Sequence, residues 1–179
     1  METNIILPAP AFNEWDLDLL IDYVLKYHHR NIRTFGVDLT KRLTALCAEH
    51  PELQTVAAHL SNSVSDLDIH CQKEEQILFP FILEMISAAN DGRQMPPFHC
   101  GTIQSPIRAM MMDHCDEIER HGRIAELTDN YAVPQNADDA YRTVMEDLRK
   151  FADQLREHTA VEDEIIFPRA IKLEMQQVG

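Results

Sequence analysis

The chain has 179 residues, of which 45% are hydrophobic and 26% are charged, and it carries a formal net charge of −14 at pH 7. That length suffices for one domain with a substantial hydrophobic core, and the presence of only five glycines favours helices. Because so much negative charge repels phosphate backbones and anionic lipids, we expect neither nucleic acid nor a membrane among the partners.

Signals that would direct the chain into or across a membrane are not recognisable in the sequence. Its apolar runs fall well short of the roughly 20 residues that span a bilayer. Its first residues, METNIILPAPAF, lack the basic start and long apolar core of a secretory signal. The four cysteines show neither CxxC spacing nor a dense framework, which is typical of reduced thiols. We therefore expect a cytoplasmic protein.

Helical periodicity begins after a short N-terminal segment, residues 1–15, and continues through most of the chain. The first predicted helix covers about residues 16–47, with Asn13 as its candidate cap. The letters HPEL interrupt the pattern, and the second predicted helix covers about residues 52–88. No segment of the sequence shows the alternation that is typical of a strand.

A loop and a second pair of helices follow. The stretch ANDGRQMPPFHCGTIQS predicts a loop, and Ser105 directly before Pro106 is typical of a helix start. The third predicted helix ends near Leu127, and Asn136 is the candidate cap of the fourth. Four amphipathic helices joined by short loops predict an all-α fold, an up-down antiparallel four-helix bundle over residues 16–177.

Two stretches of the chain repeat one pattern. HCQKEEQILFP begins at His70, and HTAVEDEIIFP begins at His158, 88 residues later. In each, a glutamate stands four residues after the histidine, at Glu74 and Glu162, and an apolar run ends in Phe-Pro. We expect each of these prolines to kink or end its helix, because proline removes a backbone donor. The repeat indicates that the chain consists of two similar helical hairpins.

The repeated histidines and glutamates fall in the apolar faces of their helices. Residues four apart share a helix face, so each His–Glu pair is expected to point into the bundle. The inward faces of the first and third helices carry one candidate histidine each. The six candidate metal ligands are His28, His70, Glu74, His114, His158 and Glu162.

A pair of metal ions would explain two buried carboxylates. Such groups are costly in an apolar interior without a partner, and no lysine or arginine falls in these faces. Four imidazoles and two bridging carboxylates can hold two cations, and this mixture favours iron over calcium or magnesium. Zinc remains the alternative ion, although its structural sites favour cysteine. We expect two iron ions with a bridging oxo or hydroxo group and one open position on each iron.

Other polar residues show weaker patterns. A lone buried histidine is more often a packed core residue than a ligand, and only the repeated register distinguishes the six candidates from that case. Asp66 lies one turn before His70, and Asp113 directly precedes His114; both fit either solvated surface acids or the lining of a solvent path. His121 lies two turns after His114 and could reach the edge of the site. No carboxylate at matching register accompanies His29, His50, His59, His99 or His121.

The motifs YHHRN, HCQKEEQILFP, MMDHCDEIE and HTAVEDEIIFP resemble the hemerythrin-like (HHE) domain of the RIC family, the di-iron proteins for repair of iron centres. The resemblance covers about residues 16–174. It implies the same six ligands, and it implies that Asp66 and Asp113 match acids that line a solvent path in that family.

The chain departs from related patterns in two respects. RIC proteins usually carry an additional N-terminal domain with a cysteine pair, whereas barely 15 residues precede the first predicted helix here, so we expect that domain to be absent. Oxygen-carrying hemerythrins have a fifth histidine one turn after that of the third helix, where this chain has Ile118. They also tend to end with HxxxxD, a spacing that Asp163 fits, although the repeat favours Glu162 as the ligand.

The resemblance and the candidate ligands support one main functional hypothesis. It is a non-haem di-iron protein of nitrosative and oxidative stress defence that repairs damaged iron-sulfur clusters or donates iron to them, with nitric oxide reduction as a further reaction. Its partners would be nitric oxide or oxygen, together with iron-sulfur proteins. The alternative is an oxygen-sensing, redox-sensing or iron-binding module without catalysis, and a metal-free helical scaffold is a third hypothesis.

Overall fold

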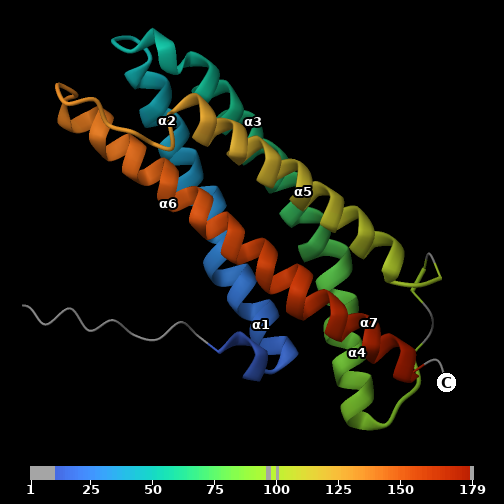
Figure 1. Ribbon diagram of the computed structural model, residues 1–179. Coiled ribbons are helices and arrows are strands. Elements are labelled where there is room, and N and C mark those ends of the chain that lie inside the picture. The colour runs from blue at the N-terminus through green and yellow to red at the C-terminus, as the bar shows by residue number, and fades with distance from the viewer. Residues whose placement is uncertain (1–10, 96–97, 100, 178–179) are drawn as a thin grey trace, which may run out of the picture.

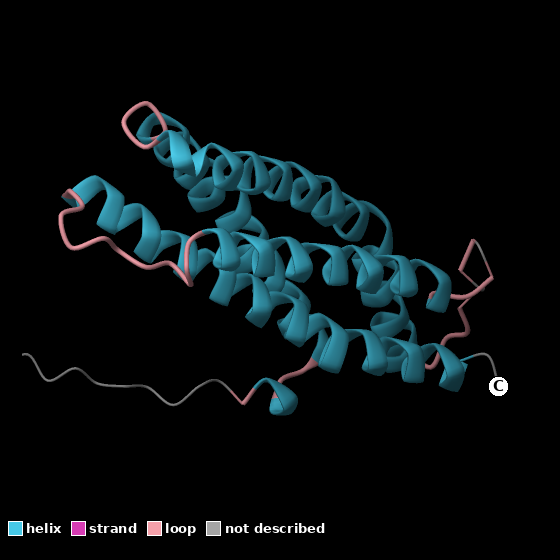
Figure 2. Cartoon of the chain, turned by 45° about the horizontal axis from the view of Figure 1, so that its top comes forward, coloured by secondary structure: helices cyan, strands magenta, loops and turns pink. Residues whose placement is uncertain are grey.

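The computed structural model describes residues 11–95, 98–99 and 101–177 of the chain. Its long helices run antiparallel beside one another (Figure 1), and the described residues form helices and loops without a β-strand (Figure 2). The all-α bundle predicted from the sequence is confirmed. Of the expected N-terminal segment, residues 1–10 lie outside the described residues, as does Cys100. Among the helices of the described ranges, none has the length and apolar composition that crossing a membrane requires.

The first long helix consists of consecutive α-helical and π-helical pieces. They are α1 (Leu17–Tyr23), the π-helical segments η2 (Val24–His29) and η3 (Ile32–Gly36), and α2 (Val37–Leu46). A short 3₁₀ turn, η1 (Phe12–Glu14), precedes this helix. Asn13 therefore lies inside that turn, and Asp16 takes the N-cap position of α1, so the expected cap is wrong.

The second long helix follows a 3₁₀ turn, η4 (Pro51–Leu53). Its pieces are α3 (Gln54–Lys73), the π-helical segment η5 (Glu74–Leu78) and α4 (Phe79–Asp91). It ends at Gly92, whose φ of 67° is a left-handed conformation that glycine adopts without a steric penalty. The helix therefore extends three residues beyond the predicted end.

The second hairpin begins with α5 (Gln104–Leu127), which starts one residue before the expected cap Ser105. The last long helix consists of α6 (Asp139–Val161), the π-helical segment η6 (Glu162–Ile166) and α7 (Phe167–Gln177). Its cap is Asp138 rather than Asn136, because Oδ1 of Asp138 accepts the backbone N–H of Tyr141 at 2.7 Å.

Each stretch that ends in Phe-Pro contains a π-helical turn that begins at its glutamate. The backbone N–H of Phe79 donates to the carbonyl oxygen of Glu74, and that of Phe167 donates to the carbonyl oxygen of Glu162. Such a turn holds one more residue than an α-helical turn. Neither proline ends its helix, since the chain continues as α4 and α7. The wide turn relieves the clash between the proline ring and the preceding carbonyl, so of the two predicted outcomes, a kink or a helix end, the end does not occur.

The hydrophobic core consists of two separate clusters. Fully buried Leu43, Leu60 and Leu148 belong to the cluster formed mainly by α2, α3 and α6. Fully buried Leu20 and Ile82 belong to the cluster formed mainly by α1, α4, α5 and α7. Buried histidines and glutamates, among them His29, Glu74, His114 and Glu162, lie where the two clusters meet along each long helix, so a polar layer lies between two apolar ends.

Gly36 permits a close approach of the first and last long helices. A Cβ atom at this position would lie 2.9 Å from Cε2 of Phe151 and 3.1 Å from Cγ2 of Val64. Protein interiors are packed too densely to absorb an additional atom without a shift of its neighbours. The glycine therefore positions α6, and with it the polar layer, against the first helix.

Candidate metal centre

Six buried side chains converge in the polar layer. Their ligand atoms form two groups, and within each group all of these atoms lie within 4.8 Å of one another. Glu74 and Glu162 belong to both groups and have no solvent exposure. The first group is His29, Glu74, His158 and Glu162, and the second is His70, Glu74, His114 and Glu162.

The helical spacing predicted from the sequence produces most of this convergence. Nε2 of His70 lies 3.4 Å from Oε2 of Glu74, four residues later. In the second hairpin, Nε2 of His158 lies 3.0 Å from Oε1 of Glu162. His114 approaches from α5, with its Nε2 3.1 Å from Oε2 of Glu162. These five residues come together as the sequence pattern predicted.

His29 takes the position in the cluster that the sequence analysis assigned to His28. Nε2 of His29 lies 3.3 Å from Oε2 of Glu74, whereas His28 is in neither group of described residues. The His28 side chain is also buried, but its ring stacks on that of His158, with centroids 5.1 Å apart and an interplanar angle of 12°. The π-helical turn Val24–His29 alters the register that an α-helical period assumes, so counting along the apolar face selected the neighbouring residue.

Acidic side chains outside the cluster contact the second ring nitrogen of two histidines. Nδ1 of His29 lies 2.8 Å from Oε1 of Glu75, and Nδ1 of His114 lies 2.9 Å from Oδ1 of Asp163. Glu75 and Asp163 each directly follow a shared glutamate, and they are 88 residues apart. Such a contact fixes the tautomer, so that the lone pair of Nε2 faces the cluster. Asp163, the alternative to Glu162 in the sequence, thus contacts a histidine of the cluster and is in neither group.

The remaining two histidines differ in their outer contacts. Nδ1 of His70 lies 3.3 Å from Oδ2 of Asp113, and Lys73 donates a hydrogen bond to the same oxygen at 2.9 Å. Nδ1 of His158 is buried and has no hydrogen-bond partner among the described residues. The acidic partner of His29 comes from another helix, so spacing along its own helix could not have predicted it.

The pKa values show that the cluster attracts positive charge. Burial alone lowers the pKa of His29, but the adjacent Cys71 and Glu74 raise it to about 11. Burial also opposes protonation of His114, yet contacts with two acidic side chains raise its pKa to about 10. Burial raises the pKa of Glu162, but the neighbouring histidines outweigh it and hold the value well below the ordinary one. In the absence of metal, protons supply the positive charge that the carboxylates require.

Buried atoms without hydrogen bonds indicate what the cluster accepts. Both carboxylate oxygens of Glu74, Oε2 of Glu162 and Nε2 of His29 are buried, and none makes a hydrogen bond within the described parts of the chain. Buried acceptors without donors are costly, and their lone pairs are the electron pairs that a metal ion uses. Imidazole and carboxylate together are ligands for iron and similar transition metals. The residues present therefore fit a pair of metal ions.

A cavity of about 190 Å³ lies beside His70. Asp66 and Asp113, the two acids predicted to border a solvent path, both line it. Each acid is paired with a cation on the cavity wall: Arg120 donates to Asp66 at 2.7 Å, and Lys73 donates to Asp113 at 2.9 Å. The cavity thus brings the predicted path residues next to one histidine of the cluster.

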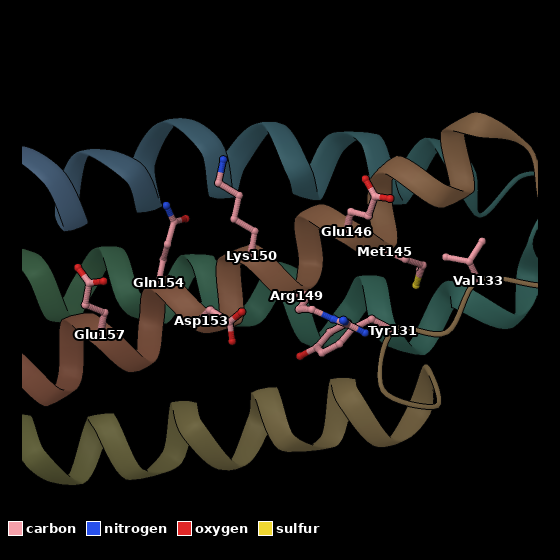
Figure 3. A pocket seen from close by; sticks show the side chains of 9 residues that line it. All are labelled: Tyr131, Val133, Met145, Glu146, Arg149, Lys150, Asp153, Gln154 and Glu157. Atoms are coloured by element: carbon pink, nitrogen blue, oxygen red, sulfur yellow. The ribbon is translucent and has the colours of Figure 1, made fainter. Parts of the chain in front are cut away.

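A larger groove, of about 560 Å³, follows the outer side of α6 (Figure 3). Glu157 stands at one end of this groove and Val133 at the other, and the charged side chains between them are of both signs. His121, which could have reached the site's edge, instead has its Nε2 3.0 Å from Oγ of Ser63 and is in neither metal-ligand group of the described residues.

Comparisons with known proteins agree with this geometry. The family model described as Hemerythrin HHE cation binding domain matches residues 20–170. Several curated relatives carry the name iron-sulfur cluster repair protein YtfE. The protein from Enterobacter sp. (strain 638) is 28% identical over 169 residues, which cover 90% of this chain and 71% of the relative.

Two further relatives with the same name show similar likeness. The protein from Musicola paradisiaca (strain Ech703) is 34% identical over 117 residues, covering 65% of this chain and 47% of the relative. The protein from Yersinia pestis (strain Pestoides F) is 28% identical over 157 residues, covering 86% of this chain and 65% of the relative. The matched region thus spans between 47% and 71% of the length of these relatives.

Proposed function

Because the chain belongs to the Hemerythrin HHE cation binding domain family, we propose that its polar cluster binds two iron ions with a bridging oxo or hydroxo group. His29 and His158 would hold one ion, His70 and His114 would hold the other, and Glu74 and Glu162, which belong to both groups, would serve both ions. The observation that carries this assignment is the full burial of two carboxylates whose oxygens lie against histidine ring nitrogens from all four long helices. The ligand set replaces the predicted His28 with its neighbour.

The protein's own side chains prepare the site for a small ligand. Bound iron supplies one-electron redox chemistry and an open coordination position. Glu75 and Asp163 hold two imidazoles in the orientation that binding needs. The apolar clusters on both sides of the polar layer exclude water from it. The cavity lined by Asp66 and Asp113 gives a diatomic molecule, nitric oxide or oxygen, a route to His70.

The biological role that fits such a site is the repair of iron-sulfur clusters damaged by nitric oxide or oxidants in the cytoplasm. The name of the relatives, iron-sulfur cluster repair protein, supports this role. In our proposal the chain gives up iron to damaged iron-sulfur proteins, which are then its partners. Reduction of nitric oxide, with electrons from bound ferrous ions, would be a second reaction at the same site.

Reversible oxygen binding or redox sensing is the alternative function. One observation disfavours oxygen carriage: the position one turn after His114 is Ile118, whose side chain is 38% exposed. A fifth histidine at that position, which the oxygen-carrying pattern requires, is therefore replaced by an apolar residue outside the cluster.

Repair can be tested with an iron-sulfur enzyme inactivated by nitric oxide. The iron-loaded protein should restore activity to this enzyme, and the His114→Ala variant, which loses a ligand, should restore much less. Free ferrous ion at the same total concentration serves as a control. Equal recovery with wild type, with His114→Ala and with free iron would contradict a specific repair role while leaving the iron-binding assignment intact.

A further inference from the structure

The contacts to the Nδ1 atoms of the four cluster histidines repeat between the two halves of the site, with one exception. Asp113 directly precedes His114 and contacts Nδ1 of His70, a histidine on the other helix of the same group. The residue that precedes His29 is His28, and it faces His158, again a histidine of the same group. His28 therefore occupies the place that an aspartate occupies in the other half of the site.

This exchange deprives one histidine of an anionic partner. The His28 ring stacks on His158 and does not bond to it, and Nδ1 of His158 finds no hydrogen-bond partner among the residues that the structure describes. A cavity of only about 10 Å³ lies between these two rings and the pair formed by Asn31 and Gln154. That volume is about the minimum for one water molecule. An imidazole, unlike a carboxylate, never brings negative charge to its neighbour.

The charges around the two metal positions differ accordingly. The His70–His114 position has two carboxylates on its outer nitrogens, Asp113 and Asp163, and only Asp113 is bound to a cation, Lys73. The outer charge there is net negative.

The His29–His158 position has one such carboxylate, that of Glu75, and Arg33 donates to it at 2.7 Å. The outer charge there is neutral. Glu157, at the end of the groove along α6, lies 3.4 Å from Nε2 of His28, but His28 is in neither ligand group of the described residues, so this carboxylate is not on the outer nitrogen of a ligand histidine (Figure 3).

A carboxylate on the outer nitrogen makes an imidazole a stronger metal ligand, and loss of such a contact typically lowers metal affinity roughly 10–100-fold. We infer that the two metal positions are unequal, and that the ion held by His29 and His158 is bound more weakly than the ion held by His70 and His114. The weaker position is then the one that releases its ion to an acceptor. This inference rests on the proposed binding of two ions by the cluster.

Equilibrium titration of the metal-free protein with ferrous ion, in anaerobic competition with a chelating dye, tests the inference. Two affinities separated by roughly 10–100-fold are expected. Because repulsion between the ions would also separate two affinities, variants must assign them. His29→Ala should abolish the weak phase and keep the tight one, and His114→Ala should abolish the tight phase.

Two reciprocal substitutions probe the cause of the inequality. His28→Asp supplies the missing carboxylate. It should raise the affinity of the weaker position for ferrous ion and reduce the difference between the two affinities. Asp113→His should lower the affinity of the tighter position toward that of the weaker one. His59→Asp, a matched substitution on α3 at a residue in neither ligand group of the described residues, should leave both affinities unchanged.

The possible outcomes separate the inference from the proposed function. If wild type binds two ions but His29→Ala removes the tight phase, or His28→Asp leaves the gap unchanged, the inference is wrong and the di-iron site stands. If wild type, folded by circular dichroism, binds no ferrous ion, both fail.

Discussion

Oδ1 of Asp163 lies 2.9 Å from Nδ1 of His114 and thereby connects the last long helix to the imidazole of α5. This aspartate stands directly after Glu162, so the π-helical turn that begins at the glutamate also presents the residue that orients a histidine. Glu75 repeats the arrangement toward His29 in the other hairpin. The repeat thus extends beyond the proposed metal ligands to the acids that contact them.

The first prediction concerns this orienting contact. Asp163→Ala should lower the affinity for ferrous ion roughly 10–100-fold, because the His114 ring loses its fixed orientation and its anionic partner. Dye competition measures the affinity. Asp153→Ala on the exposed side of α6 is the matched control and should change nothing. An Asp163→Ala protein with wild-type affinity would show that the contact has no influence on metal binding.

The second prediction distinguishes the neighbouring histidines of the first helix. His29→Ala should reduce the bound iron from two ions to one after mild washing, because one ion loses a ligand. His28→Ala should retain two ions, since its side chain is in neither group of described residues. Metal analysis by mass spectrometry with protein quantitation measures the ratio. The reverse result would restore the original sequence prediction.

The third prediction concerns pH. The pKa of His29 is raised to about 11 and that of His114 to about 10, so both imidazoles are protonated near neutrality in the metal-free protein. A ligand imidazole must be neutral, so metal binding has to displace these protons. Affinity for ferrous ion should therefore fall as pH falls and rise as pH rises.

Calorimetry in buffers with different heats of ionisation measures the proton release directly. At saturation, wild type should release more protons per protein molecule than His29→Ala does, because two protonated imidazoles are displaced rather than one. A binding enthalpy that does not depend on the buffer would refute the displacement of protons from these two imidazoles.

The fourth prediction concerns packing. Gly36→Ala should destabilise the metal-free protein by about 1–3 kcal/mol, because the added Cβ would lie 2.9 Å from a ring atom of Phe151. Gly122→Ala should instead raise the free energy of unfolding by up to about 1 kcal/mol. Alanine favours helix, and no atom lies within 4 Å of a Cβ added at Gly122. Urea unfolding measures both, and equal effects would contradict the tight approach at Gly36.

The sequence predicted what depends on spacing along one helix. His70 and Glu74 lie four residues apart in a helix that remains α-helical up to the glutamate, so the counting rule holds there. The same is true of His158 and Glu162. His114 lies in α5, which is α-helical throughout, and its inward direction was also predictable.

Two kinds of information were not accessible to that reasoning. The π-helical turn η2 shifts the register of the first helix, and the letters YHH do not reveal which histidine turns inward. The contacts of Glu75 and Asp113 with histidines join residues of different helices, so they depend on how the helices pack. The helix starts were wrong by one to three residues. Two caps are aspartates that follow the expected asparagines by two or three residues, and α5 begins after Ile103, which no capping pattern indicates.

The division of the core into two apolar clusters has a consequence for how the molecule opens. Each apolar cluster is a small unit that unfolds cooperatively. The polar layer between the two clusters is the part of the bundle that needs positive charge to balance its carboxylates. Without ions, amide hydrogens in the middle of the helices should exchange sooner than those at either end. If the cluster binds ions as proposed, their loss should therefore loosen the middle of the bundle while both ends stay folded.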